Sequence, residues 1–230
     1  MTNSRVSIDD AKNMIYRSPV LFFDFDGTLV NLDTLNVESF KYVFRSMFEF
    51  DFTKEDFMKY VSGRSSENGI RKYLEINGIT DYSGKDLNNM FNMYKDKLID
   101  EEIDSKVYLT NGVEEFLKYY NFKRLIIVTS SRREYVERIL GYFDILKYFE
   151  KIFDRLDTVR GKPNPLPYEN AIKYANITGE GVGFEDSFYG LQSSKGAGLF
   201  TIGIQNTGWN DEFVYELADS VISDYRSLIS

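Results

Sequence analysis

The chain has 230 residues, of which 43% are hydrophobic and 28% charged, so it can form one large domain or one domain with an insertion. It contains neither cysteine nor histidine, which excludes disulfides, thiolate nucleophiles, histidine general bases and the usual zinc sites. The net charge of −8 argues against binding to nucleic acid or to an anionic membrane. Acid–base and metal-binding functions therefore fall to carboxylates, hydroxyls and lysines, which favour a hard ion such as Mg2+.

No apolar run approaches the roughly 18 residues that are needed to cross a bilayer. The first 18 residues have no apolar centre of the kind found in secretory signals. We therefore expect a cytoplasmic protein. The same segment has helical spacing around Ala11 and Ile15, from which no function follows.

Apolar runs at residues 20–25, 125–129 and 182–184 are typical of buried parallel strands, and small polar or acidic residues follow each of them. Further strands are expected at 198–204 and 220–222. Amphipathic helical patterns separate these runs. This alternation predicts an α/β fold with a parallel sheet.

Between residues 32 and 105 the pattern changes, because apolar residues such as Val37 and Phe40 recur at helical spacing and no convincing strand is present. We interpret this stretch as a helical insertion. The predicted domains are thus an α/β core of residues 1–31 and 106–230 and a helical domain of residues 32–105.

The first polar motif, Asp24-Phe25-Asp26-Gly27-Thr28, comes directly after the first strand. Residues two apart on an extended segment point the same way, so Asp24 and Asp26 are expected to face one site at the strand's carboxyl end. Gly27 permits a tight turn whose N–H groups can bind phosphate oxygens. Two adjacent carboxylates call for a divalent cation, although a pair of helix-capping aspartates is the alternative.

The second motif, Thr129-Ser130-Ser131, follows the second apolar run and offers a hydroxyl and free N–H groups before a helix. Such a segment binds anions or simply caps the helix. In the third motif, prolines at 163, 165 and 167 follow Lys162 and stiffen its loop. A lysine fixed in this way can neutralise a carboxylate and a phosphate together, whereas the alternative is a solvated loop lysine.

The fourth motif places Glu185 and Asp186 after the third apolar run, where they supply oxygen ligands for a hard metal or cap the next helix. Each motif has an ordinary structural explanation when taken alone. Together they are expected to meet, because the carboxyl ends of parallel strands lie at one edge of the sheet.

The order of these four motifs, from residue 20 to about residue 203, resembles the haloacid dehalogenase superfamily. The insertion resembles the helical cap of the subgroup that contains β-phosphoglucomutase and phosphoglycolate phosphatase. The resemblance implies a Rossmann-like three-layer α/β/α core with a mobile cap. It also implies a Mg2+-dependent phosphatase that acts on a small phosphorylated metabolite through an aspartyl phosphate. We expect a monomer or weak dimer without nucleic-acid or membrane partners.

The resemblance also implies roles for single residues. Asp24 would attack phosphorus, and Asp26 would protonate the leaving alkoxide and then activate water. Lys162 would orient the nucleophile, and Thr129 would hold the phosphoryl group. The implied phosphate-binding residues are Gly27, Ser130 and Ser131. The implied Mg2+ ligands are Asp24, Asp186 and the main-chain carbonyl of Asp26. Glu185 would bind the ion directly or contact one of its ligands.

Arg64 lies between two expected helices, in a loop that reaches the active site in the resembling subgroup. It can bind a second anionic group of the substrate or be an ordinary surface arginine. Sugar phosphomutases are the main rival, but they commonly carry a hinge histidine where this chain has Asn36. A catalytically silent binding protein is disfavoured because the expected catalytic residues are all present. The sequence therefore predicts hydrolysis of a small phosphate monoester, such as a sugar phosphate or phosphoglycolate.

Overall fold

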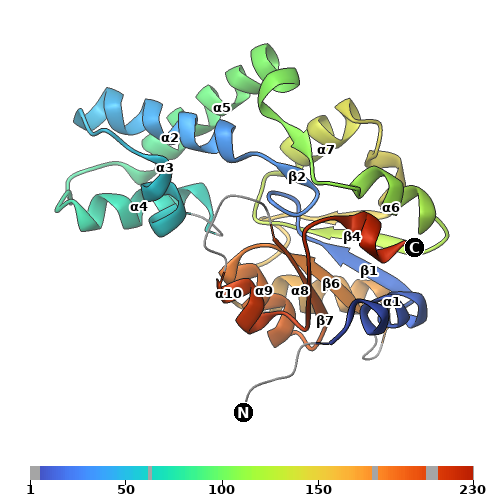
Figure 1. The fold of residues 1–230 in the computed structure, drawn as a ribbon. Helices are drawn as coiled ribbons and strands as arrows, with labels where there is room; N and C mark the ends of the chain where they lie inside the picture. The colour runs from blue at the N-terminus through green and yellow to red at the C-terminus, as the bar shows by residue number, and fades with distance from the viewer. Residues whose placement is uncertain (1–5, 62–63, 178–180, 206–211, 230) are drawn as a thin grey trace. The chain divides into compact units, whose positions relative to one another are not determined.

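The computed structural model describes residues 6–61, 64–177, 181–205 and 212–229. The chain divides into two compact units (Figure 1). We call Met1–Val30 with Leu109–Ser230 the sheet unit and Asn31–Tyr108 the helical unit. In the described residues, no helix combines the length and the apolar character that crossing a membrane requires.

The sheet unit is built on a six-stranded sheet in the order β5-β4-β1-β6-β7-β8, in which all neighbouring strands are parallel. The strands are β1 (Val20–Phe23), β4 (Arg124–Val128), β5 (Lys151–Phe153), β6 (Val182–Glu185), β7 (Phe200–Ile204) and β8 (Ser220–Ile222). The predicted α/β fold class is confirmed. The edge strand β5 lies outside the five predicted strands.

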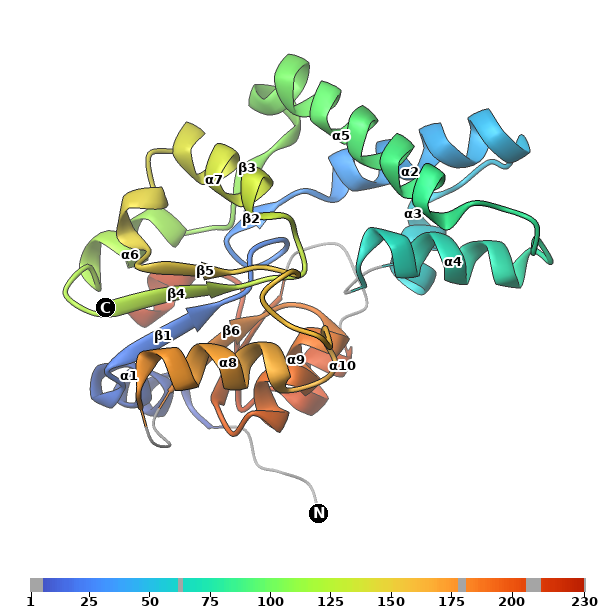
Figure 2. The same cartoon turned by 180° about the vertical axis from the view of Figure 1, so that it is seen from behind.

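Helices cover both faces of this sheet (Figure 2). They are α1 (Ile8–Arg17), α6 (Val113–Tyr119), α7 (Arg133–Tyr142), α8 (Leu166–Ala175), α9 (Phe188–Gly196) and α10 (Glu212–Leu217), with short 3-10 turns η2 (Leu146–Tyr148) and η3 (Tyr225–Leu228). The helical spacing seen around residue 11 corresponds to α1, which buries Ala11 and Ile15 and begins at the capping side chain of Ser7.

The alternation of side chains along β1 decides which helix covers which face. Phe22 packs with Tyr168 of α8 in one apolar cluster. The next residue, Phe23, points the other way and stacks on Phe184 with ring centroids 4.6 Å apart. It also meets Phe116 of α6 edge-on at 6.2 Å. Because both faces are covered, the central strand β1 is apolar and buried along its whole length, and the polar residue Asp24 follows it directly.

The helical unit contains α2 (Asp33–Phe48), α3 (Lys54–Asp56), the π-helical turn η1 (Phe57–Val61), α4 (Ser66–Ile76) and α5 (Gly84–Lys106). Two-residue strands, β2 (Val30–Asn31) and β3 (Tyr108–Leu109), pair with each other where the chain enters and leaves this unit. Its core is an aromatic cluster. Phe40 lies at its centre, with ring centroids 4.5 Å from Phe91, 5.5 Å from Phe52 and 6.0 Å from Phe44.

Candidate active site

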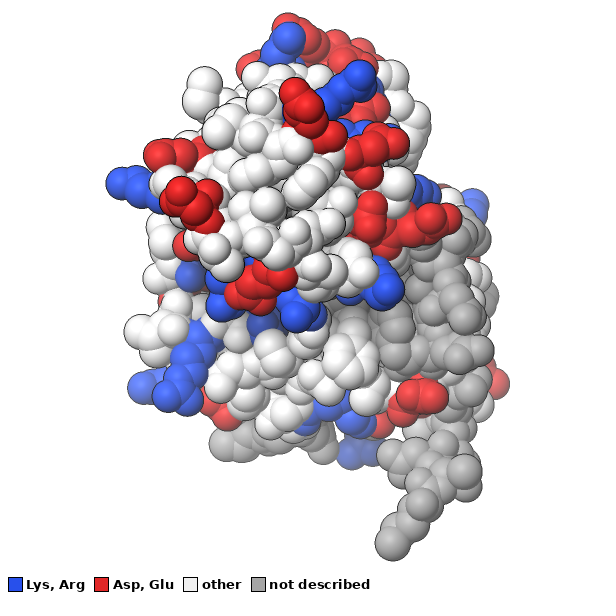
Figure 3. All heavy atoms as spheres, turned by 90° about the vertical axis from the view of Figure 1, so that its left-hand side faces the viewer, with Lys and Arg blue, Asp and Glu red and all other residues white. Residues whose placement is uncertain are grey.

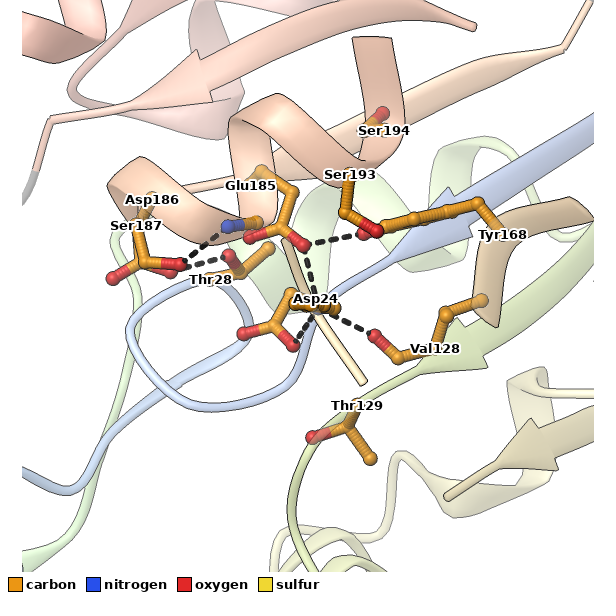
Figure 4. Close-up of polar contacts among 12 residues, drawn as sticks. Asp24, Thr28, Val128, Thr129, Tyr168, Glu185, Asp186, Ser187, Ser193 and Ser194 are labelled. Carbon is orange, nitrogen blue, oxygen red and sulfur yellow. Dashed lines mark hydrogen bonds and ion pairs between the residues drawn. The ribbon is translucent and has the colours of Figure 1, made fainter. Parts of the chain in front are cut away.

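Three strand ends meet at one edge of the central sheet, and each carries a polar residue (Figure 4). Asp24 directly follows β1, Thr129 directly follows β4, and Glu185 is the last residue of β6. Because β1 lies between β4 and β6 in a parallel sheet, the three residues reach the same edge. The N–H of Asp24 donates to the Phe184 carbonyl at 2.9 Å, which ties the start of this loop to β6.

Lys162 reaches this edge from the loop that precedes α8. Its Nζ donates to Asp24 Oδ1 at 2.6 Å, to Glu185 Oε1 at 2.5 Å and to the Val128 carbonyl at 2.9 Å. Burial alone would lower the pKa of Lys162, but the charges of Asp24 and Glu185 raise it above its usual value. The Lys162 ammonium therefore joins two buried carboxylates, those of Asp24 and Glu185.

Asp24, Glu185 and Asp186 form an acidic group whose candidate ligand atoms all lie within 4.8 Å of one another. Burial, followed by the charges of Asp24 and Glu185, raises the pKa of Asp186 well above its usual range. Burial also raises the pKa of Glu185 to about 7, with Asp24 acting in the same direction and Lys162 against it. The single positive charge of Lys162 thus does not neutralise the three carboxylates of this group.

The donor set of this acidic group fits a divalent cation. Oε2 of Glu185 is buried and has no hydrogen-bond partner among the described residues. An unpaired buried carboxylate oxygen costs free energy unless a proton or a cation is next to it. Hard oxygen ligands at this spacing are what Mg2+ and similar ions bind.

Gly27 makes room for Asp186 in the turn after β1. Its φ is +83°, and a Cβ at this position would lie 1.9 Å from Asp186 Oδ2, so only glycine fits. Thr28 Oγ1 donates to Asp186 Oδ1 at 3.1 Å. The N–H of Gly27 donates to the Val30 carbonyl at 2.7 Å. Gly27 thus leaves space for the Asp186 carboxylate, and its contribution to phosphate binding stays a prediction.

Asp26 lies near the acidic group, but its carboxylate is not part of it. Its backbone forms a bridge with Val30, and its side chain is partly exposed. Its carboxylate is not in the group of Asp24, Glu185 and Asp186, although its charge contributes to the raised pKa of Asp186. A carboxyl group that is closer to solvent is better placed to exchange protons with a leaving group and water than to bind an ion.

The hydroxyl of Thr129 is fixed by its own loop. Its Oγ1 accepts a hydrogen bond from the N–H of Ser131 at 3.0 Å, and its N–H donates to the Phe153 carbonyl at 2.9 Å. A hydroxyl carries one proton of its own, so Thr129 can donate it to an anion while it accepts from Ser131. Ser130 is partly exposed between them, just before α7.

Arg64 belongs to the helical unit and follows η1. Its N–H donates to the Val61 carbonyl at 2.9 Å, and its side chain is partly exposed. Two other residues of the predicted specificity loop, Ser62 and Gly63, lie outside the described residues.

Two residues that the sequence did not single out touch the site. Tyr168 of α8 donates its hydroxyl to Glu185 Oε1 at 2.5 Å. Gly190 of α9 lies against the same carboxylate, since a Cβ there would be 1.9 Å from Glu185 Oε2. A buried tyrosine in an amphipathic helix and a glycine after a cap have ordinary structural meanings, so only their contacts mark them.

Comparison with known proteins places this geometry in a family. Residues 21–204 match the family model of the haloacid dehalogenase-like hydrolases. The phosphorylated carbohydrates phosphatase of Thermotoga maritima is 31% identical over 186 residues, which are 78% of this chain and 81% of that protein. The pyrophosphatase PpaX of Listeria monocytogenes is 26% identical over 188 residues, 80% of this chain and 82% of that protein. A crystal structure of β-phosphoglucomutase from Clostridium difficile has a similar fold, with a TM-score of 0.78, 19% identity, and coverage of 92% of this chain and 93% of that one.

The chain belongs to the haloacid dehalogenase-like hydrolases, since the family model spans most of its length. The predicted superfamily and the predicted kind of enzyme are thereby confirmed, and relatives named as phosphatases agree with this class. The Rossmann-like fold that the resemblance implied is confirmed by the parallel sheet and by the similar solved structure.

Proposed function

We propose that this hydrolase is a Mg2+-dependent phosphatase that cleaves a small phosphate monoester with Asp24 as nucleophile. The observation that carries the proposal is the ion pair between Lys162 and Asp24, placed at the strand edge where Asp186 and Glu185 also end. A carboxylate nucleophile splits one difficult displacement into two easier ones. The relatives named as phosphatases support a phosphate ester as the substrate.

In the first step, an Asp24 carboxylate oxygen bonds to phosphorus while the bond from phosphorus to the ester oxygen breaks. Asp26 gives its proton to the leaving alkoxide. In the second step, Asp26 takes a proton from water, whose oxygen bonds to phosphorus and releases phosphate, which restores Asp24. One acid–base residue thus serves both steps in opposite senses.

Lys162 and Thr129 hold the reacting groups. The Lys162 ammonium keeps Asp24 Oδ1 in place and offsets the charge that develops when the phosphoryl group arrives. The Thr129 hydroxyl donates to a phosphoryl oxygen, aided by the N–H of Ser130 in the loop before α7. Positioning and charge stabilisation of this kind account for most of the catalysis in phosphoryl transfer.

The residues that would hold Mg2+ are Asp24, Asp186 and the main-chain carbonyl of Asp26, with Glu185 alongside. When bound, the ion neutralises charge on the carboxylates and on the phosphoryl oxygens. The raised pKa values of Asp186 and Glu185 support this assignment, because a cation is what allows both groups to be ionised together.

We assign the helical unit the part of a cap that selects the substrate, with Arg64 binding a second anionic group. A sugar phosphate fits this description, and the relative from Thermotoga maritima is named for phosphorylated carbohydrates. Asn36, which stands where related mutases commonly have a histidine, accepts a hydrogen bond from Lys95 at 2.6 Å within this unit. An amide does not exchange protons as an imidazole does, so we propose hydrolysis and not phosphate migration. The cytoplasmic location stays a prediction.

Release of inorganic phosphate from a panel of esters tests the proposal. The panel holds hexose phosphates, phosphoglycolate, nucleoside monophosphates and pyrophosphate, each with Mg2+ and with excess chelator. We expect Mg2+-dependent release from at least one ester, and the ranking identifies the leaving group. No release from any of them would contradict the proposal.

A further inference from the structure

Tyr168 is a fully buried side chain whose hydroxyl reaches the site. Its ring packs in the apolar cluster beneath the sheet with Val20 and Phe22. Its hydroxyl extends past this cluster to Glu185 Oε1, at 2.5 Å (Figure 4). Burial, with the charges of Glu185 and Asp24, raises the pKa of Tyr168 well above its usual value, so the hydroxyl remains a donor.

Glu185 Oε1 therefore accepts two short hydrogen bonds, one from Tyr168 and one from Lys162 Nζ at 2.5 Å. The same Nζ also serves Asp24. The Tyr168 hydroxyl is a second, neutral donor to Oε1 of Glu185. Glu185 therefore depends less on the Lys162 ammonium, which also binds Asp24. Without the Tyr168 hydroxyl, Lys162 would be drawn toward Glu185 and away from the nucleophile, since an unsatisfied buried carboxylate is costly.

Gly190 fixes the other side of the same carboxylate. A Cβ at Gly190 would lie 1.9 Å from Oε2 and 2.2 Å from Cδ of Glu185. The carboxylate thus occupies the volume that a side chain at position 190 would take. Tyr168 on α8 and Gly190 on α9 together leave Glu185 one orientation, with Oε1 toward Lys162 and Oε2 without a partner among the described residues.

We propose that Tyr168 is a positioning residue, whose hydroxyl orients Glu185 so that Lys162 stays shared with Asp24 and the acidic group keeps the spacing that a divalent ion needs. This inference rests on the proposed function: its catalytic part on the proposed hydrolysis, and its ion-binding part on the proposed Mg2+ site alone. Partners that orient metal-binding groups typically change metal affinity or activity by about 10–100-fold when they are removed.

The test is Tyr168→Phe, which keeps the ring and removes the hydroxyl. Calorimetric titration with Mg2+ should show a Kd raised by about 10-fold. In steady-state assays, kcat should fall by about 10-fold while KM for the ester stays within about 2-fold. The matched control is Tyr120→Phe, because Tyr120 is also buried and its hydroxyl donates to the Leu228 carbonyl at 3.0 Å, which serves only packing. This control should bind Mg2+ like the parent.

Equal Mg2+ affinity in folded Tyr168→Phe and in the parent would overturn the inference. If Tyr168→Phe does not fold, Gly190→Ala replaces it, since alanine favours a helix and displaces the Glu185 carboxylate from the opposite side. Gly190→Ala should also weaken Mg2+ binding by about 10-fold or more, and unchanged affinity would again overturn the inference. A parent that hydrolyses no ester would refute the proposed function, while the calorimetric comparison would still decide the role of Tyr168.

Discussion

The two units of this chain use buried polar groups in opposite ways. In the sheet unit, carboxylates, a lysine and a tyrosine hydroxyl are buried together beside one strand edge, where burial and neighbouring charges raise the pKa values of Tyr168 and Asp186 well above their usual range. In the helical unit, the core is a cluster of aromatic rings around Phe40, and its buried lysine donates to the neutral amide of Asn36. Buried charge that is concentrated and only partly compensated indicates chemistry, whereas stacked aromatic rings indicate stability.

The charged side chains drawn in Figure 3 do not form a large patch of one sign. On the face drawn in Figure 3, acidic and basic side chains are interspersed. Such mixing of the two charges is typical of a solvated surface. The following predictions test whether the division between the two units holds.

The largest effect is expected from Asp24→Asn in the sheet unit. The substitution keeps the shape and removes the nucleophile, so kcat should fall by about 1,000-fold or more. The thermal melting temperature should change little, because Lys162 retains its ion pair with Glu185. A variant that keeps the parent's rate would show that the chemistry is elsewhere.

Phe40→Ala in the helical unit should lower stability and leave Mg2+ binding unchanged, whereas Asp24→Asn should lower activity and leave stability nearly unchanged. Phe40 is 1% exposed, and its truncation should lower the free energy of unfolding by about 3–5 kcal/mol, measured by urea denaturation. Under folding conditions, its Kd for Mg2+ should equal the parent's. Met47→Ala is the control on the same helix, since Met47 is 52% exposed, and it should change stability by about 0.5 kcal/mol or less. Weakened Mg2+ binding in Phe40→Ala would break the comparison.

The acidic group should make stability depend on pH and on Mg2+ together. The pKa values of Glu185 and Asp186 are raised in the folded chain, so without metal the fold loses stability as pH rises from the usual carboxyl pKa toward about 7. Mg2+ should offset this loss, by about 2.7 kcal/mol at 100 times its Kd. Melting curves at pH 5 and pH 8, with and without chelator, should show the larger Mg2+ effect at pH 8. A larger effect at pH 5 would contradict the assignment.

The smallest effect is expected from Arg64→Ala. If the helical unit contributes only selection, kcat/KM should fall several-fold for esters with a second anionic group and remain unchanged for those without one. Arg71→Ala is the control, because Arg71 lies on α4, is 62% exposed at its side chain and pairs with Glu75. Equal losses on both kinds of ester would remove Arg64 from substrate selection.

The sequence predicts those features of the molecule that depend on neighbouring residues, such as strands, the residues at their ends and stiff loops. A short apolar run followed at once by Asp24 or Glu185 predicts a buried strand, and several such runs together predict strand ends that meet at the ligand-binding edge of a parallel sheet. The prolines that follow Lys162 also predicted a stiff loop, which can hold the lysine side chain in one place. These features gave the α/β fold and the strand-end residues.

What the sequence does not predict depends on distant contacts. The Tyr168 hydroxyl donates to Glu185, which is 17 residues away in the sequence, and no motif around either residue predicts this hydrogen bond. Gly190 is needed only because a carboxylate from another element fills its side-chain volume. The edge strand β5 is three residues long, too short for a periodic signal. The hydrogen bond from the Gly27 N–H to the Val30 carbonyl also depends on how the turn after β1 closes, which no local pattern indicates.

The most direct test of the account is to look for the phosphorylated form of Asp24. The enzyme would be mixed with its best ester and Mg2+, quenched rapidly in acid, digested and analysed by mass spectrometry. We predict a phosphoryl group on Asp24 that appears before steady state and is absent from Asp24→Asn. Turnover by the parent with the phosphoryl group on a different residue, or with none on any peptide at any time, would contradict the account.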